Sequence, residues 1–325
     1  MRVLVTGATG FLGYHIAKDL LKDGHEVINF SRRHTSEVDE LGIETIKGDL
    51  TNYEDIKNAL RDIDAVFHAA GKVGMWGKSK DFHRINVDGT KNLVNAMKEQ
   101  GAKYLIYTST PSVVFGKDEI KNGDESLPYP KKYLNEYAKS KSIAERFVLE
   151  SNGHGILTTS IRPHLIYGER DKNIIPRLIQ RAKSGRLKII GDGQNLVDIN
   201  YVENASHAHV MALKELSTEA KNQGKAYFIG QEKPVNLWDF INKILEAKGE
   251  KPISSKVSLK IVYFIGLIFE LIYKLLGKYD DQPPMTRFVA LQMGTSHYFK
   301  HDNARVDFGY SPKITIEESL EKIKN

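Results

Sequence analysis

TGATGFLG, residues 6–13, is the stretch that decides the fold of this chain. A short apolar run at 2–5 precedes it and predicts a β-strand, and an amphipathic segment at 14–22 follows it and predicts a helix. Gly24 is placed to end that helix in a left-handed cap, and residues 26–30 predict a second strand. Strand, glycine turn, helix and strand form the first unit of a doubly wound parallel sheet.

The three glycines of this turn are spaced G-x-x-G-x-x-G, which lets the backbone turn tightly and approach a pyrophosphate. The phosphate would then meet the positive end of the helix. The alternative is a glycine-rich turn that binds nothing, but its position between a strand and a helix favours a dinucleotide site. The cofactor-binding residues expected here are Gly7, Thr9, Gly10, Phe11, Leu12 and Gly13.

The residues after the second strand, Ser31, Arg32 and Arg33, are expected to select the cofactor. An acidic residue at this position would bind the 2′-hydroxyl of the NAD ribose. Two guanidinium groups instead suit a 2′-phosphate through bidentate contacts, so the sequence favours NADP(H) over NAD(H). In the alternative interpretation, the arginines are only solvated loop residues and either cofactor binds.

The rest of the first half alternates strands and helices, which predicts an α/β fold with a parallel, Rossmann-type sheet. Strands are expected at 43–47, 64–68, 103–109 and 155–162, and helices at 53–60 and 81–98. Asp49 follows the third strand, where it either accepts from an adenine amino group or caps the next helix. Ala69 and Ala70 follow the fourth strand and are small enough for a ligand to lie against the backbone.

The pattern loosens beyond residue 165, which suggests a change of role. We expect a dinucleotide-binding domain at 1–165, with further core strands from 195–230, and a mainly substrate-binding region at 166–325. In that second region, helices are expected at 174–183 and 237–247. Short strands are expected at 187–190, 195–201 and 225–229.

The composition narrows the classes of function. With no cysteine among its 325 residues, the chain has no disulfides, thiolate metal sites or cysteine nucleophile. His207 and His209 would lie on different faces of a helix, so no metal site is expected. The net charge of +6 suits an anionic partner, but no basic run is interleaved with aromatics, so nucleic acid is not expected. The first residues run directly into a strand without a signal peptide, which makes a cytoplasmic protein the expectation.

A tyrosine and a lysine four residues apart form the candidate catalytic pair. The segment 135–150 reads as a helix, so Tyr137 and Lys141 lie one turn apart on one face. An ammonium beside a phenol is expected to lower the pKa of Tyr137 and make it a usable acid or base near neutral pH. Taken alone, such a pair is more often a solvated helix face.

The segment 256–276 is unusually apolar, and its role stays open at this point. It is too short and too interrupted by charge to span a bilayer. Three interpretations compete: a lid over an apolar substrate, a helix lying on a membrane or a partner, and a plain core helix. The apolar residues that fall on one helical face are Ile261, Phe264, Ile265, Ile268, Leu271, Ile272 and Leu275.

Taken together, these motifs resemble those of the extended short-chain dehydrogenases/reductases, over nearly the whole chain. The order is the glycine turn, Asp49, the turn at 68–71, NV-x-GT at 86–90, TST at 108–110, Tyr137-x-x-x-Lys141 and RP at 162–163. The chain is similar to the 3β-hydroxysteroid dehydrogenase-like branch, and within it to the 2-alkyl-3-oxoalkanoate reductases of bacterial long-chain olefin biosynthesis. The stretches that carry this likeness are KVGMWG at 72–77, YTSTPSVVF at 107–115, RPHLIYG at 162–168, GDGQNLVD at 191–198 and PMTRF at 284–288. Sterol dehydrogenases share several of them.

The resemblance implies that Tyr137 is the general acid/base and that Lys141 binds the nicotinamide ribose. The hydroxyl partner, usually a serine, falls at Thr110, with Ser109 and Ser112 as neighbours. The cofactor contacts expected from the whole set of motifs are those of the glycine turn together with Ser31, Arg32, Arg33, Asp49, Leu50, Ala69, Ala70, Lys72, Tyr137, Lys141 and Pro163. Arg287 or Lys72 is a candidate contact for a substrate carboxylate.

The expected reaction is NADPH-dependent reduction of the ketone of a long-chain 2-alkyl-3-oxoalkanoate to the 3-hydroxy acid, in olefin biosynthesis. An NAD(P)-dependent 3β-hydroxysteroid or sterol dehydrogenase is the first alternative. A non-catalytic NADP-binding scaffold is the alternative of another class. The expected partner is a lipophilic small molecule, and membrane or pathway-enzyme contact through 256–276 and a homodimer are open possibilities.

Overall fold

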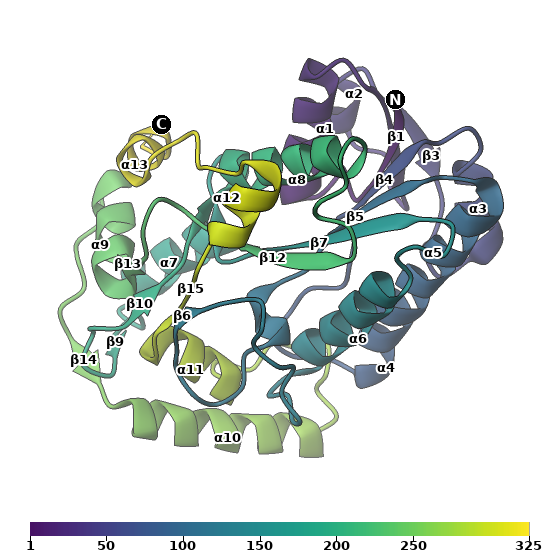
Figure 1. Ribbon diagram of the computed structural model, residues 1–325. Helices are drawn as coiled ribbons and strands as arrows, with labels where there is room; N and C mark the ends of the chain where they lie inside the picture. The colour runs from purple at the N-terminus through teal and green to yellow at the C-terminus, as the bar shows by residue number, and fades with distance from the viewer. Residues whose placement is uncertain (325) are drawn as a thin grey trace.

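A seven-stranded, fully parallel sheet forms the centre of the molecule (Figure 1), as the computed structural model of residues 1–324 shows. Its strand order is β12-β7-β5-β4-β1-β2-β3, so the chain winds outward from β1 in both directions. This confirms the predicted fold class. The strands are β1 (Arg2–Thr6), β2 (Glu26–Ser31), β3 (Glu44–Lys47), β4 (Ala65–His68), β5 (Tyr104–Thr108), β7 (Leu157–Pro163) and β12 (Lys225–Ile229).

Helices cover both faces of this sheet, because alternate strand residues point to opposite sides. Val3 and Val5 of β1 belong to the apolar core on one side, whereas Leu4 belongs to the core on the other. The first side carries α1 (Phe11–Lys22), α8 (Val202–Leu216) and α12 (Asp302–Phe308). The second side carries α3 (Tyr53–Ala59), α5 (Gly89–Gln100) and α6 (Glu136–Glu150).

One predicted helix differs from the structure, and the cap of another, which the sequence left open, is now identified. The expected helix at 81–98 is divided into α4 (Ser79–Phe82), a π-helical turn (His83–Asp88) and α5. The helix α3 is capped by Asn52, whose side chain accepts from the backbone N–H of Glu54, and not by Asp49. The short helix α2 (Ser36–Asp39) lies between β2 and β3.

The second half of the chain, apart from α8, β12 and α12, packs largely around an apolar core of its own, which includes Trp238, Tyr167 and Phe240. Helices α7 (Ile174–Lys183) and α9 (Leu237–Ala247) match their predicted bounds. A four-stranded sheet of order β13-β10-β15-β6 lies in this part. The remaining elements are β6 (Ile120–Gly123), a 3₁₀ turn (Pro111–Val113), β8 (Ile166–Tyr167), β9 (Ile189–Ile190), β10 (Leu196–Val197), β11 (Asn200–Tyr201), β13 (Val235–Asn236), β14 (Lys256–Val257), α10 (Leu259–Leu275), α11 (Arg287–Gly294), β15 (His297–Phe299) and α13 (Ile316–Lys322).

The helix α10 lies across one end of the molecule, below α11 in the view of Figure 1. Its predicted apolar face points to solvent: the side chains of Phe264 and Leu275 are 61% and 85% exposed. The interpretation of this face as core is therefore wrong. No helix among residues 1–324 is long and apolar enough to cross a membrane.

Candidate functional site

The carboxyl ends of β1, β2, β4 and β5 meet at one edge of the sheet, and the sequence-predicted site residues gather there. Gly7 follows β1 with φ at +82°, and a Cβ atom built on it would lie 3.0 Å from the backbone of Ala70. A Cβ atom on Gly13 would lie 2.1 Å from the carbonyl oxygen of Gly7. Only glycine fits at these two positions, so the turn brings its backbone close against the end of β4.

The amino end of α1 is available to an anion. Gly10 caps this helix with extended backbone geometry and provides no side-chain acceptor for its first N–H groups. Phosphate groups bind at such helix ends, where the N–H groups and the helix dipole favour negative charge. The tight glycine cradle and the uncapped helix thus fit a dinucleotide.

Arg32 and Arg33 lie next to this turn, because β2 pairs with β1 along its whole length. Both side chains are exposed, and neither pairs with a carboxylate among residues 1–324. Asp49 lies nearby: burial acts to raise its pKa, but hydrogen bonds from Thr51 and the guanidinium of Arg32 hold that pKa below its usual range. Asp49 is therefore an anion at neutral pH.

A buried histidine holds the end of β4. His68 bonds through Nδ1 to the hydroxyl of Thr6 at 2.8 Å and through Nε2 to the hydroxyl of Thr90 at 3.0 Å. Burial lowers the pKa of His68 to about 3, so the ring stays neutral. The same Thr6 hydroxyl accepts from the N–H of Ala70 at 3.3 Å. This network fixes the Ala69–Ala70 turn against the glycine motif.

Tyr137 is the second residue of α6, which begins after Asn135. The Asn135 side chain accepts from the N–H of Ala138 at 2.8 Å and so caps the helix. Burial raises the pKa of Tyr137 to about 12, and a hydrogen bond with Thr110 acts in the opposite direction. The phenol is consequently protonated at neutral pH.

Lys141 lies one turn further along α6, but its ammonium does not influence the phenol as predicted. Its Nζ donates to the carbonyl oxygen of Thr108 at 2.6 Å and lies 4.1 Å from the ring centroid of Tyr107. Burial lowers the pKa of Lys141 to about 7, against a smaller opposing effect of Glu145. The expectation that Lys141 lowers the pKa of Tyr137 is wrong for this arrangement, because the ammonium is directed to the end of β5.

Thr110 lies at the end of β5, opposite Tyr137. Its hydroxyl donates to the hydroxyl of Ser112 and accepts from the Ser112 N–H, both at 3.2 Å. Ser109 is also buried, but its N–H donates to the carbonyl of Ile161 in β7. Of the three candidate hydroxyls, only that of Thr110 contributes to the shifted pKa of Tyr137.

Two residues that support this site were given no role of their own in the sequence analysis. Glu145 continues the stripe of Tyr137 and Lys141 by one more turn and is completely buried. It accepts from Arg162 of β7 through both oxygens, at 2.7 and 2.9 Å, and from the hydroxyl of Tyr129 at 2.7 Å. The regular four-residue spacing of these three polar residues was a signal that could have revealed it.

Asn86, in the π-helical turn, is the second such residue. Its amide donates to the hydroxyl of Ser140 at 2.9 Å and to the carbonyl of Lys72 at 3.0 Å, and accepts from the Lys72 N–H at 2.7 Å. It therefore joins α6 to the loop after β4. Lys72 itself places Nζ 5.4 Å from the ring centroid of Phe82.

The remaining predicted residues lie at or near the same edge. Pro163 is the buried last residue of β7, and Leu50 is buried where β3 leads into α3. Arg287, a candidate contact for a substrate carboxylate, instead donates from its backbone N–H and its Nε to the two carboxylate oxygens of Glu270, each at 2.7 Å. That leaves Lys72 as the candidate without such a partner among residues 1–324.

An apolar cluster adjoins the start of α6. Its buried members are Phe115, Phe288 and Leu291, and the half-buried Met75, Leu134 and Tyr263 pack against them, as do Ile120 and Leu259. The side chain of Asn135 reaches the sulfur of Met75 at 3.9 Å. Apolar packing thus extends from Leu134, just before α6, to Leu259 and Tyr263 of α10.

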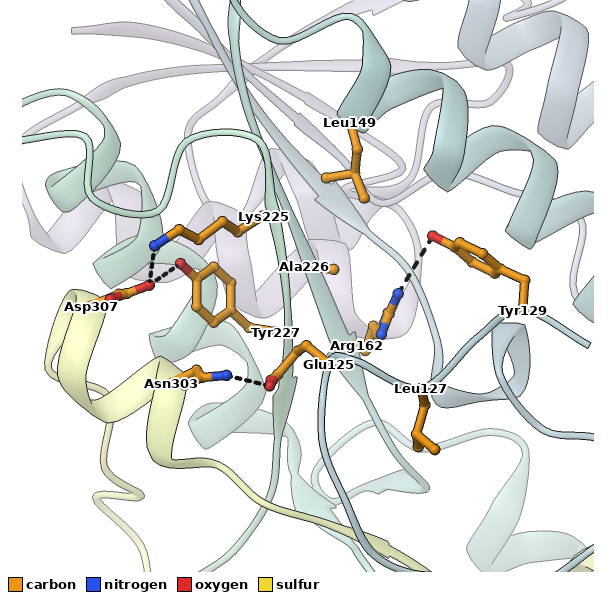
Figure 2. Close-up of a pocket in the computed structure, with 10 residues that line it drawn as sticks. All are labelled: Glu125, Leu127, Tyr129, Leu149, Arg162, Lys225, Ala226, Tyr227, Asn303 and Asp307. Carbon is orange, nitrogen blue, oxygen red and sulfur yellow. Dashed lines mark hydrogen bonds and ion pairs between the residues drawn. The ribbon is translucent and has the colours of Figure 1, made fainter.

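A separate cavity of about 530 Å³ lies at the β12 edge of the sheet (Figure 2). Two pairs of its lining residues bond to each other: Lys225 pairs with Asp307 at 2.8 Å, and Asn303 donates to Glu125 at 2.6 Å. None of the candidate catalytic or cofactor residues lines it. This cavity is therefore not part of the candidate site.

Among residues 1–324, no cluster of His, Asp and Glu side chains could hold a metal ion.

The model of one protein family matches residues 4–261, which is most of the chain. The chain belongs to the 3-beta hydroxysteroid dehydrogenase/isomerase family. This confirms the resemblance found in the sequence. Members of this type are NAD(P)-dependent oxidoreductases with the extended short-chain dehydrogenase/reductase fold, and so is this protein.

Individual relatives of the family cover nearly the whole chain. A 2-alkyl-3-oxoalkanoate reductase of Stenotrophomonas maltophilia is 40% identical over 100% of this chain and 98% of its own. A decarboxylating sterol-4-alpha-carboxylate 3-dehydrogenase of Mus musculus is 35% identical over 98% and 88%. Among solved structures, UDP-glucuronic acid 4-epimerase from Bacillus cereus in complex with NAD has a TM-score of 0.77 at 23% identity, covering 100% of this chain and 99% of its own.

Proposed function

We propose that this enzyme reduces the ketone of a long-chain 2-alkyl-3-oxoalkanoate to the 3-hydroxy acid, with NADPH as the reductant. The observation that carries the proposal is the apolar cluster around Phe115, Met75 and Tyr263, which adjoins Asn135 and the start of α6. A substrate with a reactive ketone and long alkyl chains matches the polar pair Thr110 and Tyr137 next to this apolar cluster. Relatives at 40% and 41% identity that bear this activity in their names add support.

Tyr137 supplies the proton in this proposal. Bound NADPH provides the hydride that reaches the carbonyl carbon. The Thr110 hydroxyl and the Tyr137 phenol donate hydrogen bonds to the carbonyl oxygen, where negative charge develops. The phenol then transfers its proton to that oxygen, so that the ketone becomes an alcohol. A pKa of about 12 for Tyr137 keeps the acid form available across the physiological range.

Lys141 and Lys72 have supporting roles in the proposal. The Lys141 ammonium, at the end of β5, binds the ribose next to the nicotinamide. Lys72 lies on the loop that Asn86 ties to α6 and receives the substrate carboxylate. A carboxylate held at this point fixes the distance between the acid group and the ketone, which favours a 3-oxo acid.

Selection of NADPH is assigned to Arg32 and Arg33. Two exposed guanidinium groups beside the glycine turn favour a 2′-phosphate. We expect the double variant Arg32→Ala, Arg33→Ala to raise the KM for NADPH by about 10- to 100-fold and to leave that for NADH within about twofold. Arg305→Ala, which removes a guanidinium from the distant α12, is the matched control. Equal losses for both cofactors would contradict the assignment.

A sterol dehydrogenase is the second candidate. It is favoured by relatives such as the Mus musculus enzyme, at 35% identity over nearly the whole chain. The same apolar cluster would then contact a fused-ring substrate, and the reaction would run as an oxidation. Tyr137 would in that case act as the phenolate and accept the proton of the substrate hydroxyl.

The test compares the two substrate classes side by side. NADPH consumption is measured with a racemic long-chain 2-alkyl-3-oxoalkanoate, and NADP⁺ and NAD⁺ reduction with a 3β-hydroxysterol. We expect turnover of the keto acid and little or none of the sterol. A short-chain 3-oxo acid tests the contribution of the apolar cluster to substrate binding and should be a much poorer substrate. Turnover of the sterol alone would move the protein to the second candidate.

A further inference from the structure

The outer face of α10 has no partner within the described chain. Eight large apolar side chains on it are exposed by 40% to 85%: Ile261, Phe264, Ile265, Ile268, Leu271, Ile272, Leu275 and Leu276. Their spacing of three and four residues places them along one side of the 17-residue helix, a length of about 25 Å. A continuous apolar stripe of this size on a surface marks an interaction site.

The orientation of α10 is fixed from its inner side. Val262, Gly266 and Glu270 form the buried stripe that faces the protein. A Cβ atom on Gly266 would lie 2.7 Å from the backbone of Thr286, so glycine lets α10 approach α11 closely. Glu270 accepts from the backbone N–H and the Nε of Arg287 at the start of α11. These contacts hold the apolar side outward.

Positive charge accompanies the apolar stripe. Within 256–278 the sequence has four lysines, at 256, 260, 274 and 278, and a single acidic residue, Glu270, whose carboxylate is neutralised by Arg287. All four lysines are exposed, and none pairs with a carboxylate among residues 1–324. Beyond them, Asp280 lies 3.7 Å from Lys78, and Asp281 is exposed. Apolar side chains with lysines at both ends of a helix suit an anionic bilayer surface.

We propose that α10 docks this enzyme onto the surface of an anionic lipid bilayer. The helix lies in the plane of the interface, with Phe264, Ile268 and Leu271 inserted among the acyl chains and the lysines at the headgroups. The length and charge of α10 favour this position over a membrane span. A partner protein, or a second copy of this chain, is the competing occupant of the same face.

This docking would place the candidate site near the membrane. The Trp76 ring stacks on Tyr279 with centroids 5.9 Å apart, and its Nε1 donates to the carbonyl of Lys278 at 2.9 Å. The loop of Trp76 is the one that Asn86 ties to α6, and its neighbour Met75 packs in the apolar cluster. A lipophilic substrate would therefore enter from the acyl layer beside α10. The docking itself stands independently of the proposed substrate.

The experiment is flotation of the purified full-length protein with lipid vesicles, without substrate or cofactor. One set is phosphatidylcholine, and the other is an equal mixture of phosphatidylcholine and phosphatidylglycerol. We expect binding to the mixed vesicles, and a fall of at least about tenfold in the double variant Phe264→Asn, Leu271→Asn. Val306→Asn, at a 73% exposed position on α12, is the matched control and should bind as the original protein does.

The lysines are tested separately. Lys260→Gln and Lys274→Gln should each weaken binding to the mixed vesicles by about fivefold, and added salt should act in the same direction. Equal binding to neutral vesicles would overturn the anionic preference. No binding to either set, or unchanged binding by the double variant, would overturn the proposal. A third outcome would also overturn the proposal: the original protein is a dimer in sedimentation velocity, the double variant is a monomer, and neither binds the vesicles.

Discussion

The helices α6 and α10 both break the rule that a helix buries its apolar residues and exposes its charged ones, but in opposite directions. α6 buries Lys141 and Glu145, whereas α10 exposes a row of isoleucine, leucine and phenylalanine side chains. Each is fixed by one carboxylate that binds an arginine of the neighbouring element: Glu145 to Arg162, and Glu270 to Arg287. The comparison teaches that departures from the expected pattern are where function is best sought, and they coincide with the proposed reaction centre in one helix and the proposed docking surface in the other.

The two anchoring pairs differ in burial. The side chains of Arg162 and Glu145 are 3% and 0% exposed, while those of Arg287 and Glu270 are 30% and 9% exposed. Removal of one partner from a buried pair leaves an uncompensated charge, and this cost falls as water gains access. The pair of Arg162 and Glu145 should therefore matter more to stability than the pair of Arg287 and Glu270.

The largest expected effect is that of Glu145→Ala. We expect the free energy of unfolding to fall by about 3–5 kcal/mol, because Arg162, Tyr129 and Ser160 all lose an acceptor. Urea denaturation followed by circular dichroism measures it. Glu26→Ala, which removes the exposed partner of Arg2, is the control and should cost about 1 kcal/mol or less. Similar losses in both variants would contradict the assigned burial.

Glu270→Ala is expected to have an intermediate effect. The backbone N–H and the guanidinium of Arg287 lose their acceptor, but the arginine side chain retains access to water. We expect a loss of about 1–3 kcal/mol in the same urea experiment. A loss as large as that of Glu145→Ala would show that the two helices are anchored equally and would remove the contrast between them.

The smallest effect concerns pH. Burial lowers the pKa of Lys141 to about 7, so its ammonium is present below that pH and is lost as the pH rises through it. We expect kcat/KM for NADPH to fall above about pH 7, by up to tenfold per pH unit, because the neutral amine binds the ribose less well.

A companion variant sharpens the pH prediction. The Glu145 carboxylate acts to raise the pKa of Lys141, so Glu145→Gln should move the midpoint of this profile to lower pH. Thermal unfolding of that variant, measured at each pH, shows whether the protein stays folded over the range in which the midpoint of kcat/KM moves. A profile that stays flat from pH 6 to pH 8 in the original protein would contradict the role of Lys141.

Local patterns predicted much of the fold. The glycine turn, the first strands and the bounds of α7 and α9 follow from short-range chemistry: a tight turn, strand residues and helical periodicity. The sequence motifs likewise predicted the family and the parallel sheet. The roles of Tyr137, Lys141 and Thr110 stay predictions, although the structure brings all three to the meeting point of α6 and β5.

Long-range contacts account for what the sequence could not predict. Whether the apolar stripe of α10 faces inward depends on Gly266 and Glu270 meeting α11, and periodicity alone cannot distinguish the two sides of a helix. The direction of the Lys141 ammonium depends on the carbonyl of Thr108, 33 residues away in the chain. The π-helical turn at His83–Asp88 positions Asn86 between two elements and has no distinct local signature.

The most direct test of the central claim, that α6 carries the proton donor for ketone reduction, is the kcat of Tyr137→Phe. It is measured with NADPH and a long-chain 2-alkyl-3-oxoalkanoate, next to Tyr53→Phe, the same change on the distant α3. We predict a loss of about 10²–10⁴-fold in kcat for Tyr137→Phe, with unfolding unchanged, and no loss for Tyr53→Phe. Undiminished turnover by Tyr137→Phe would contradict the account.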